Sequence, residues 1–177
     1  MQKKVQIISD GSLDLSQELT KEKDIEVVPF YVSFNGETYQ KEIEEIGIRE
    51  FYQEMVDHPT VFPKTSMPSV HDYYEVFEKH AKEKMPVICI CITRKFSGSL
   101  QSATTAKDMI LEEYPDAQIT VIDSTVNTVL QGLYVLEACR LRDMGLEYQQ
   151  IVDALLPIRE TGRIFFTIGS IDYLKHG

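Results

Sequence analysis

The chain has 177 residues, 43% of them apolar, so it is long enough to bury one good core, and a single domain is expected. It carries 28 acidic and 18 basic residues, which gives a formal net charge of −10. This charge argues against non-specific binding to nucleic acid and against a polybasic membrane contact, and it is typical of a soluble protein with a repulsive surface.

The first third of the chain contains two β-rich runs and one helical pattern. VQIISD (5–10) predicts a strand that ends in polar turn residues. IEVVPFYVSF (25–34) predicts a second β-rich segment, and Asn35-Gly36 directly after it is a turn signal for a β-hairpin. Residues 46–58 carry apolar side chains at helical spacing, and a proline-containing loop is expected after them.

The rest of the chain alternates between helices and buried strands. Ser69 and Asp72 form a capping-box pattern at the start of a helix. PVICICIT (86–93) is too uniformly apolar to be half-exposed, so it predicts a central parallel strand covered on both faces. The other predicted elements are helices at 98–113, 127–143 and 147–160, buried strands at 118–124 and 163–169, and a last helix that begins within 170–177.

This order predicts an α/β fold. The sheet is expected to be doubly wound and mainly parallel, with helices on both faces and a β-hairpin near residues 25–40.

Cys89, Cys91 and Cys139 are odd in number and have apolar neighbours, which does not fit a disulfide framework. Buried thiols in a reducing, cytoplasmic environment are expected instead. No metal is expected, because the CxC pair has no further ligand at suitable spacing. No apolar segment is long enough to span a membrane, and the N-terminal apolar run is too short for a signal peptide, so no membrane anchor is expected.

Polar residues recur where the predicted parallel strands end, which is where open α/β sheets bind ligands. They are Ser9 and Asp10 after the first strand, Thr65 and Ser66 before the helix at 70, Ser97 and Gly98 after the strand at 86–93, and Ser124 after the strand at 118–124. Residues of these types also cap helices, so capping explains much of the pattern. Hydroxyls beside helix N-termini would nevertheless suit a carboxylate or a phosphate.

Motifs for nucleotide binding and for catalysis are absent from the sequence. There is no GxGxxG after the first strand, no GxxxxGK[ST] and no GxSxG. His58, His71 and His80 fall in predicted loops or on predicted helix surfaces, so none is placed as a general base. The pattern therefore favours binding of an anion over turnover.

Six segments resemble motifs of the DegV family, in order along the whole chain. They are SDGSLDL (9–15), VVPFYVSFNGETY (27–39), KTSMPS (64–69), TRKFSGSLQSA (93–103), VIDS (121–124) with Thr128 and Gly132 after it, and IGSIDYLKHG (168–177). The resemblance implies a bacterial protein that holds one long-chain fatty acid between two lobes. It implies that Thr65 and Ser97 bind the fatty-acid carboxylate, and backbone N–H groups of Gly98 and Ser99 could add donors.

The resemblance also implies a partner and a pathway. Family members present the bound carboxylate to a fatty acid kinase, and the acyl phosphate then enters phospholipid synthesis. The family has no catalytic residues of its own, and no cofactor is implied. Family members continue past the position of Gly177, so residues 1–177 are expected to form the N-terminal lobe, with the second lobe largely absent from this chain.

Two other functions remain open at this point. One is a small enzyme for acyl or phosphoryl transfer that uses Ser97 or Asp10. The other is a truncated lobe that acts only through interactions and carries no ligand, in which case exposed apolar surface could drive formation of a homodimer.

Overall fold

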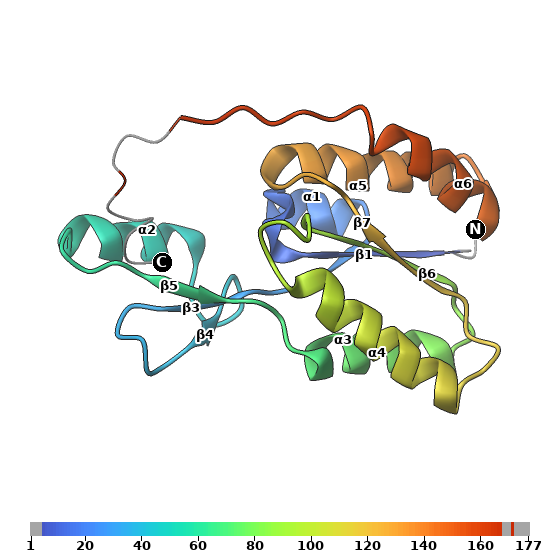
Figure 1. The fold of residues 1–177 in the computed structure, drawn as a ribbon, viewed down its shortest axis with the longest axis horizontal. Coiled ribbons are helices and arrows are strands. Elements are labelled where there is room, and N and C mark those ends of the chain that lie inside the picture. The colour runs from blue at the N-terminus through green and yellow to red at the C-terminus, as the bar shows by residue number, and fades with distance from the viewer. Residues whose placement is uncertain (1–4, 168–170, 172–177) are drawn as a thin grey trace. The chain divides into compact units, whose positions relative to one another are not determined.

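The computed structural model describes residues 5–167 and residue 171, and these fall into two compact units (Figure 1). The larger unit combines the chain up to Val28 with Pro68–Ile164. The smaller unit contains Pro29–Met67 and the described residues from Phe165 onward.

The larger unit is built on a parallel sheet. Its described strands are β1 (Gln6–Asp10), β2 (Ile25–Val28), β6 (Val87–Cys91) and β7 (Ile119–Asp123), in the order β2-β1-β6-β7. Ile7 pairs with Ile25 on one side and with Ile88 on the other, which fixes the register of the centre. Every residue of β1 and β6 is buried. For β6, this confirms the prediction made from the continuous apolar run at 86–93.

Helices cover both faces of this sheet, which confirms the predicted doubly wound architecture. Figure 1 shows α3 (Val70–Lys82) and α4 (Ser99–Glu113) on one face, with α1 (Gln17–Glu22), α5 (Thr128–Asp143) and α6 (Tyr148–Ile158) on the other. A short 3-10 helix, η1 (Gly11–Leu13), follows β1 directly.

Alternate residues of each central strand supply the two halves of the core. Ile8 and Cys89 pack with Tyr73 and Phe77 of α3, whereas Ile7 and Ile88 pack in a second cluster with residues of α5 and α6. The strand period of two residues explains this division, because successive side chains point to opposite faces.

The helix α3 begins as its sequence predicted. The Ser69 hydroxyl oxygen accepts a hydrogen bond from the Asp72 N–H at 3.1 Å, and the Asp72 carboxylate accepts one from the Ser69 N–H at 2.7 Å. This is the reciprocal capping box, and it satisfies two backbone donors at the end of the helix.

The smaller unit contains an antiparallel sheet and one helix. The strands β3 (Tyr31–Ser33), β4 (Gln40–Lys41) and β5 (Lys64–Ser66) lie in the order β4-β3-β5, and α2 (Ile48–Asp57) is the helix. The predicted hairpin is therefore present as β3 and β4, but the β-rich run at 25–34 divides at Pro29, and its first half belongs to the parallel sheet. β5 falls in the segment predicted as a loop.

The predicted buried strand at 163–169 is wrong over its described part. Residues 163–167 have no regular secondary structure, and the side chains of Phe165 and Phe166 are 93% and 68% exposed. Apolar, β-prone residues form a strand only when a neighbouring strand is placed to pair with them, and no described strand pairs with this segment. Residues 168–169 lie outside the described residues, and so does the predicted C-terminal helix, except for Ile171, which is exposed and not helical.

A partly buried ion pair joins the strand β2 to the last turn of α3. The Glu26 carboxylate lies 2.6 Å from Nε2 of His80, whose side chain is almost fully buried, and 3.1 Å from Nζ of Lys79. Burial alone would raise the pKa of Glu26, but hydrogen bonds from His80 and Lys79 outweigh it and lower this pKa below its ordinary value of 4.5.

We expect Glu26→Gln to destabilise the protein at neutral pH, with a difference that shrinks in acid. A carboxylate whose pKa is lowered by folding stabilises the folded state above its unfolded pKa, and this stabilisation is lost as the pH falls through the folded pKa. Urea unfolding of both proteins between about pH 7 and about pH 3 measures the effect. The exposed residue Glu112, changed to Gln, is the control. A difference between wild type and Glu26→Gln that stays constant into acid would contradict the ion pair.

Candidate functional site

The order of the parallel strands places a topological switch point between β1 and β6. The chain runs from β1 to β2 on one side of the sheet and from β6 to β7 on the other, so the connections leave β1 and β6 in opposite directions (Figure 1). Ligands of open α/β sheets bind in the crevice beyond the carboxyl ends of such strands. The candidate site is therefore the region that follows Asp10 and Cys91.

Asp10, the last residue of β1, is fully buried at this point. Its Oδ2 accepts hydrogen bonds from the Ile92 N–H at 2.9 Å and from the Ser99 hydroxyl at 2.7 Å. Its Oδ1 accepts one from the Gln131 amide at 2.8 Å and lies 2.7 Å from the Ser12 hydroxyl. The carboxylate is thus held by neutral donors from four segments, which is what a buried charge requires.

Ser9 and Gln131 extend the same buried network. The Ser9 hydroxyl donates to the Ile90 carbonyl at 2.9 Å and accepts from the Gln131 amide at 3.0 Å. The Ser12 hydroxyl, 2.6 Å from Oε1 of Gln131, shares its one proton between that oxygen and Asp10. Ser9, Asp10 and Gln131 have no exposed surface, so they form a wall behind the site.

The connection from β6 to α4 presents the accessible polar groups. Ser97 is half-buried, and its hydroxyl oxygen accepts a hydrogen bond from the Ser99 N–H at 3.1 Å. The hydroxyl proton of Ser97 therefore remains available to a ligand. Gly98 is exposed and is the N-cap residue of α4.

Backbone donors and the dipole of α4 add to this hydroxyl. The N–H groups of Gly98 and Leu100 have no acceptor among the described residues, and they stand at the positive end of a 15-residue helix. The Ser99 N–H, expected from the sequence to be a ligand donor, is occupied by Ser97 instead. Together the free groups suit a small anion such as a carboxylate.

Ser124 shapes the neighbouring connection between β7 and α5. Its side chain is buried, and its hydroxyl donates to the Val126 carbonyl at 2.9 Å. Thr125 and Thr128 adopt positive φ angles of 62° and 52°, which is unusual for β-branched residues. The Thr93 N–H donates to the Val126 carbonyl, so this loop is joined to the end of β6.

Thr65 and Ser66 lie in the smaller unit. Both are exposed on β5, where Thr65 pairs with Val32 and Ser66 with Tyr31. The structure thus brings Ser9, Asp10, Ser97, Gly98 and Ser124 to one end of the parallel sheet, whereas Thr65 and Ser66 belong to a separate unit.

Sequence reasoning missed two members of the network, Gln131 and the hydroxyl of Tyr73. Gln131 lies in the first turn of α5 among apolar residues, and a lone polar residue on a buried helix face would have been the only signal. Tyr73 is a fully buried core residue, and its hydroxyl lies 2.6 Å from that of Ser99. Burial raises the pKa of Tyr73 well above its ordinary value, with smaller contributions from Cys91 and Asp10, so it stays a neutral donor.

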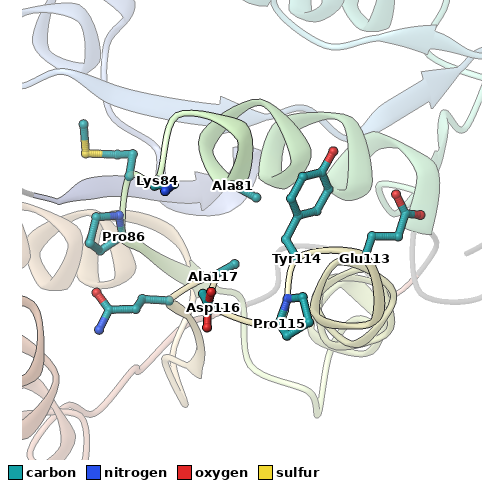
Figure 2. Close-up of a pocket in the computed structure, with 10 residues that line it drawn as sticks. Ala81, Lys84, Pro86, Glu113, Tyr114, Pro115, Asp116 and Ala117 are labelled. Atoms are coloured by element: carbon teal, nitrogen blue, oxygen red, sulfur yellow. The ribbon is translucent and has the colours of Figure 1, made fainter.

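A cavity of about 340 Å³ opens at the opposite end of the sheet (Figure 2). It is lined by the connections that lead into β6 and β7, including Lys84, Pro86, Tyr114 and Asp116. These residues precede the amino ends of the strands, and its charged side chains are exposed. The cavity therefore lacks the helix N-terminus that makes the other end suitable for an anion.

Among residues 5–167 and 171, no group of three or more His, Cys, Asp or Glu side chains is placed to hold a metal ion. Within the same residues, no helix is both long enough and apolar enough to cross a bilayer. Cys89, Cys91 and Cys139 are free and buried, as the sequence predicted.

A family model, curated proteins and solved structures that are similar to this chain all point to the same family. Residues 4–177 match the family described as "Uncharacterised protein, DegV family". A crystal structure described as a stearic acid-binding protein from Eubacterium ventriosum is 47% identical, with a TM-score of 0.92 over 98% of this chain and 59% of that one. A DegV family protein from Thermus thermophilus, described by its fatty acid binding, is 30% identical, with a TM-score of 0.74 over 89% of this chain and 54% of its own.

A DegV domain-containing protein from Clostridium perfringens is 32% identical over 173 residues, which are 98% of this chain and 60% of the relative. The chain thus spans about three fifths of the length of the curated relatives it matches. The match over residues 4–177 and the shared fold show that the chain belongs to the DegV family.

Proposed function

We propose that this chain binds a long-chain fatty acid and holds its carboxylate at the N-terminal turn of α4, where Ser97 and Gly98 donate hydrogen bonds to it. The observation that carries this proposal is the free donor set of that turn, which combines a half-buried hydroxyl with two N–H groups that have no acceptor among the described residues, at the positive end of a helix. A carboxylate that leaves water needs several such donors. The similar structures described as fatty-acid-binding support the same ligand.

The family resemblance extends this proposal to further residues and to a partner. It adds Thr65 as a second hydroxyl ligand and gives Ser9, Asp10, Ser66 and Ser124 supporting roles. It also implies that residues 1–177 act as the N-terminal lobe of a cytoplasmic carrier, which presents the carboxylate to a fatty acid kinase for phospholipid synthesis.

The bonding of the two candidate nucleophiles favours binding over catalysis. Among the described residues, the Ser97 hydroxyl has one hydrogen-bond partner, the Ser99 N–H, so no base is placed to remove its proton. Asp10 is fully buried and its oxygens are occupied by donors, so Asp10 is not accessible as a nucleophile or as a general base. We therefore propose that the chain has no catalytic activity of its own.

The first test is to denature the purified protein and to analyse the organic extract by mass spectrometry. We expect one long-chain fatty acid per chain, because each CH₂ group that leaves water contributes about 0.8 kcal/mol. Incubation with stearic acid before the extraction covers a protein purified without ligand. An extract free of fatty acid after that incubation would reject the proposal and favour a lobe that acts only through interactions.

A further inference from the structure

The buried carboxylate of Asp10 closes the base of the connection that carries Ser97 and Gly98. Residues 93–98 lie between Ile92 and Ser99, and both of these donate to the same oxygen, Oδ2, at 2.9 and 2.7 Å. One atom on β1 therefore fixes both ends of the anion-binding turn, although the turn itself belongs to β6 and α4.

A short chain of hydrogen bonds leads from Asp10 to Ser97, the residue proposed to bind the carboxylate. The Ser99 hydroxyl donates to Asp10, and the N–H of the same residue donates to the Ser97 hydroxyl oxygen at 3.1 Å. With its own proton directed at Asp10, the Ser99 hydroxyl accepts from Tyr73, 2.6 Å away. This arrangement leaves the Ser97 proton free to point away from Ser99, toward a ligand.

The other carboxylate oxygen connects the turn to the second helix at the site. Oδ1 of Asp10 accepts from the Gln131 amide of α5 at 2.8 Å, so α4 and α5 are both held through one buried side chain. We propose that Asp10 is the positioning residue of the anion site: it does not touch the ligand, but it sets the position of Ser97 and Gly98. This inference rests on the proposed function.

The carboxylate of Asp10 is essential to this role, because one of its oxygens accepts from both ends of the turn and the other accepts from α5. In Asp10→Ala, the Ile92 N–H and the Ser99 hydroxyl lose the acceptor that they share, so the turn loses its fixed base. Alanine is a sharper test than asparagine, because an asparagine amide oxygen could still face Ile92 and Ser99 while its NH₂ group donates to Ser12, whose own proton Gln131 Oε1 accepts.

The test compares two ligands that differ only in the head group. We expect Asp10→Ala to lower the affinity for stearate at least about tenfold, while the affinity for octadecanol, which has no carboxylate, falls much less. Tyr134→Phe is the matched control, since it removes one buried hydrogen bond, from Tyr134 of α5 to the Leu155 carbonyl of α6, that involves no residue of the turn. Equal losses for both ligands, or no loss, would overturn the inference.

Two further measurements keep the inference separate from the proposed function and from folding. If wild type binds neither ligand, the proposed function fails, and amide hydrogen exchange of Ser99 tests the positioning role of Asp10 alone. Faster exchange of Ser99 in Asp10→Ala than in Tyr134→Phe supports this role, and unchanged exchange overturns it. If Asp10→Ala does not fold, Ser99→Ala removes one hydrogen bond to Asp10 and keeps the other three donors. It should show the same selective loss of stearate, and an unchanged ratio of the two affinities would overturn the inference.

Discussion

Replacing Ser97 and Thr65 together by alanine is expected to lower the affinity for stearate about 100-fold or more. Each hydroxyl is proposed to donate one hydrogen bond to the carboxylate, and a bond to a charged group contributes roughly 1.5–3 kcal/mol, which is about a tenfold to hundredfold change in affinity. Octadecanol should bind both proteins with similar affinity, because it carries no charge for these donors to hold.

The single variants and a control show where such a loss comes from. Ser97→Ala and Thr65→Ala should each lower stearate affinity about tenfold, and Thr104→Ala should change it little. Thr104 lies on the same helix as the proposed site, but its hydroxyl donates to the Leu100 carbonyl of that helix. A double variant that binds stearate as tightly as wild type would reject both ligand assignments.

The parallel sheet could be predicted because its central strand can be recognised from the apolar pattern of its own residues. A strand covered on both faces favours a continuous apolar run, and PVICICIT has one up to its last residue. QITVID has a shorter apolar pattern, and the strand that it forms, β7, is buried only at Ile119 and Ile122. The start of α3 was equally local, since its capping box involves residues three apart.

Elements that depend on a distant neighbour could not be predicted in this way. RIFFTIG has the composition of a buried strand, yet its described residues find no strand to pair with and Phe165 is exposed. The six-residue helix α1 was missed for the opposite reason, because it buries no residue and so leaves no apolar period in the sequence.

The site shows the same division. Hydroxyls at strand ends identified Ser97 and Asp10 as residues at one edge of the sheet, but not which of them would be accessible. Which of the two is accessible depends on contacts between residues that are far apart in the sequence. Gln131 lies 121 positions from Asp10, and their contact depends on how closely α5 packs against the segment after β1. No local pattern encodes that distance.

Gly132→Ala is expected to destabilise the protein by about 1–3 kcal/mol, although the same change normally stabilises a helix interior by about 1 kcal/mol. A Cβ atom at this position would lie 2.4 Å from the Leu13 carbonyl oxygen and 2.8 Å from Cδ2 of Leu15. The first of these atoms belongs to the backbone, so relief requires α5 itself to move outward. Urea unfolding measures the change.

Gly47→Ala is the control for this variant. Its φ angle is −72°, and no atom lies within 4 Å of an added Cβ, so the expected change is below about 1 kcal/mol. If Gly132→Ala stabilised the protein, α5 could not lie against Leu13 as closely as the structure shows.

Gly132→Ala is also expected to affect the candidate site, through the adjacent residue Gln131. Gln131 precedes Gly132, and its amide reaches Ser9 and Asp10 only while α5 stays close to β1. An outward shift of α5 should therefore weaken stearate binding more than octadecanol binding, as in Asp10→Ala. If Gly132→Ala lowered stability but left the ratio of the two affinities unchanged, the position of the α4 turn would depend on Ile92 and Ser99 alone, and Gln131 would serve only the fold.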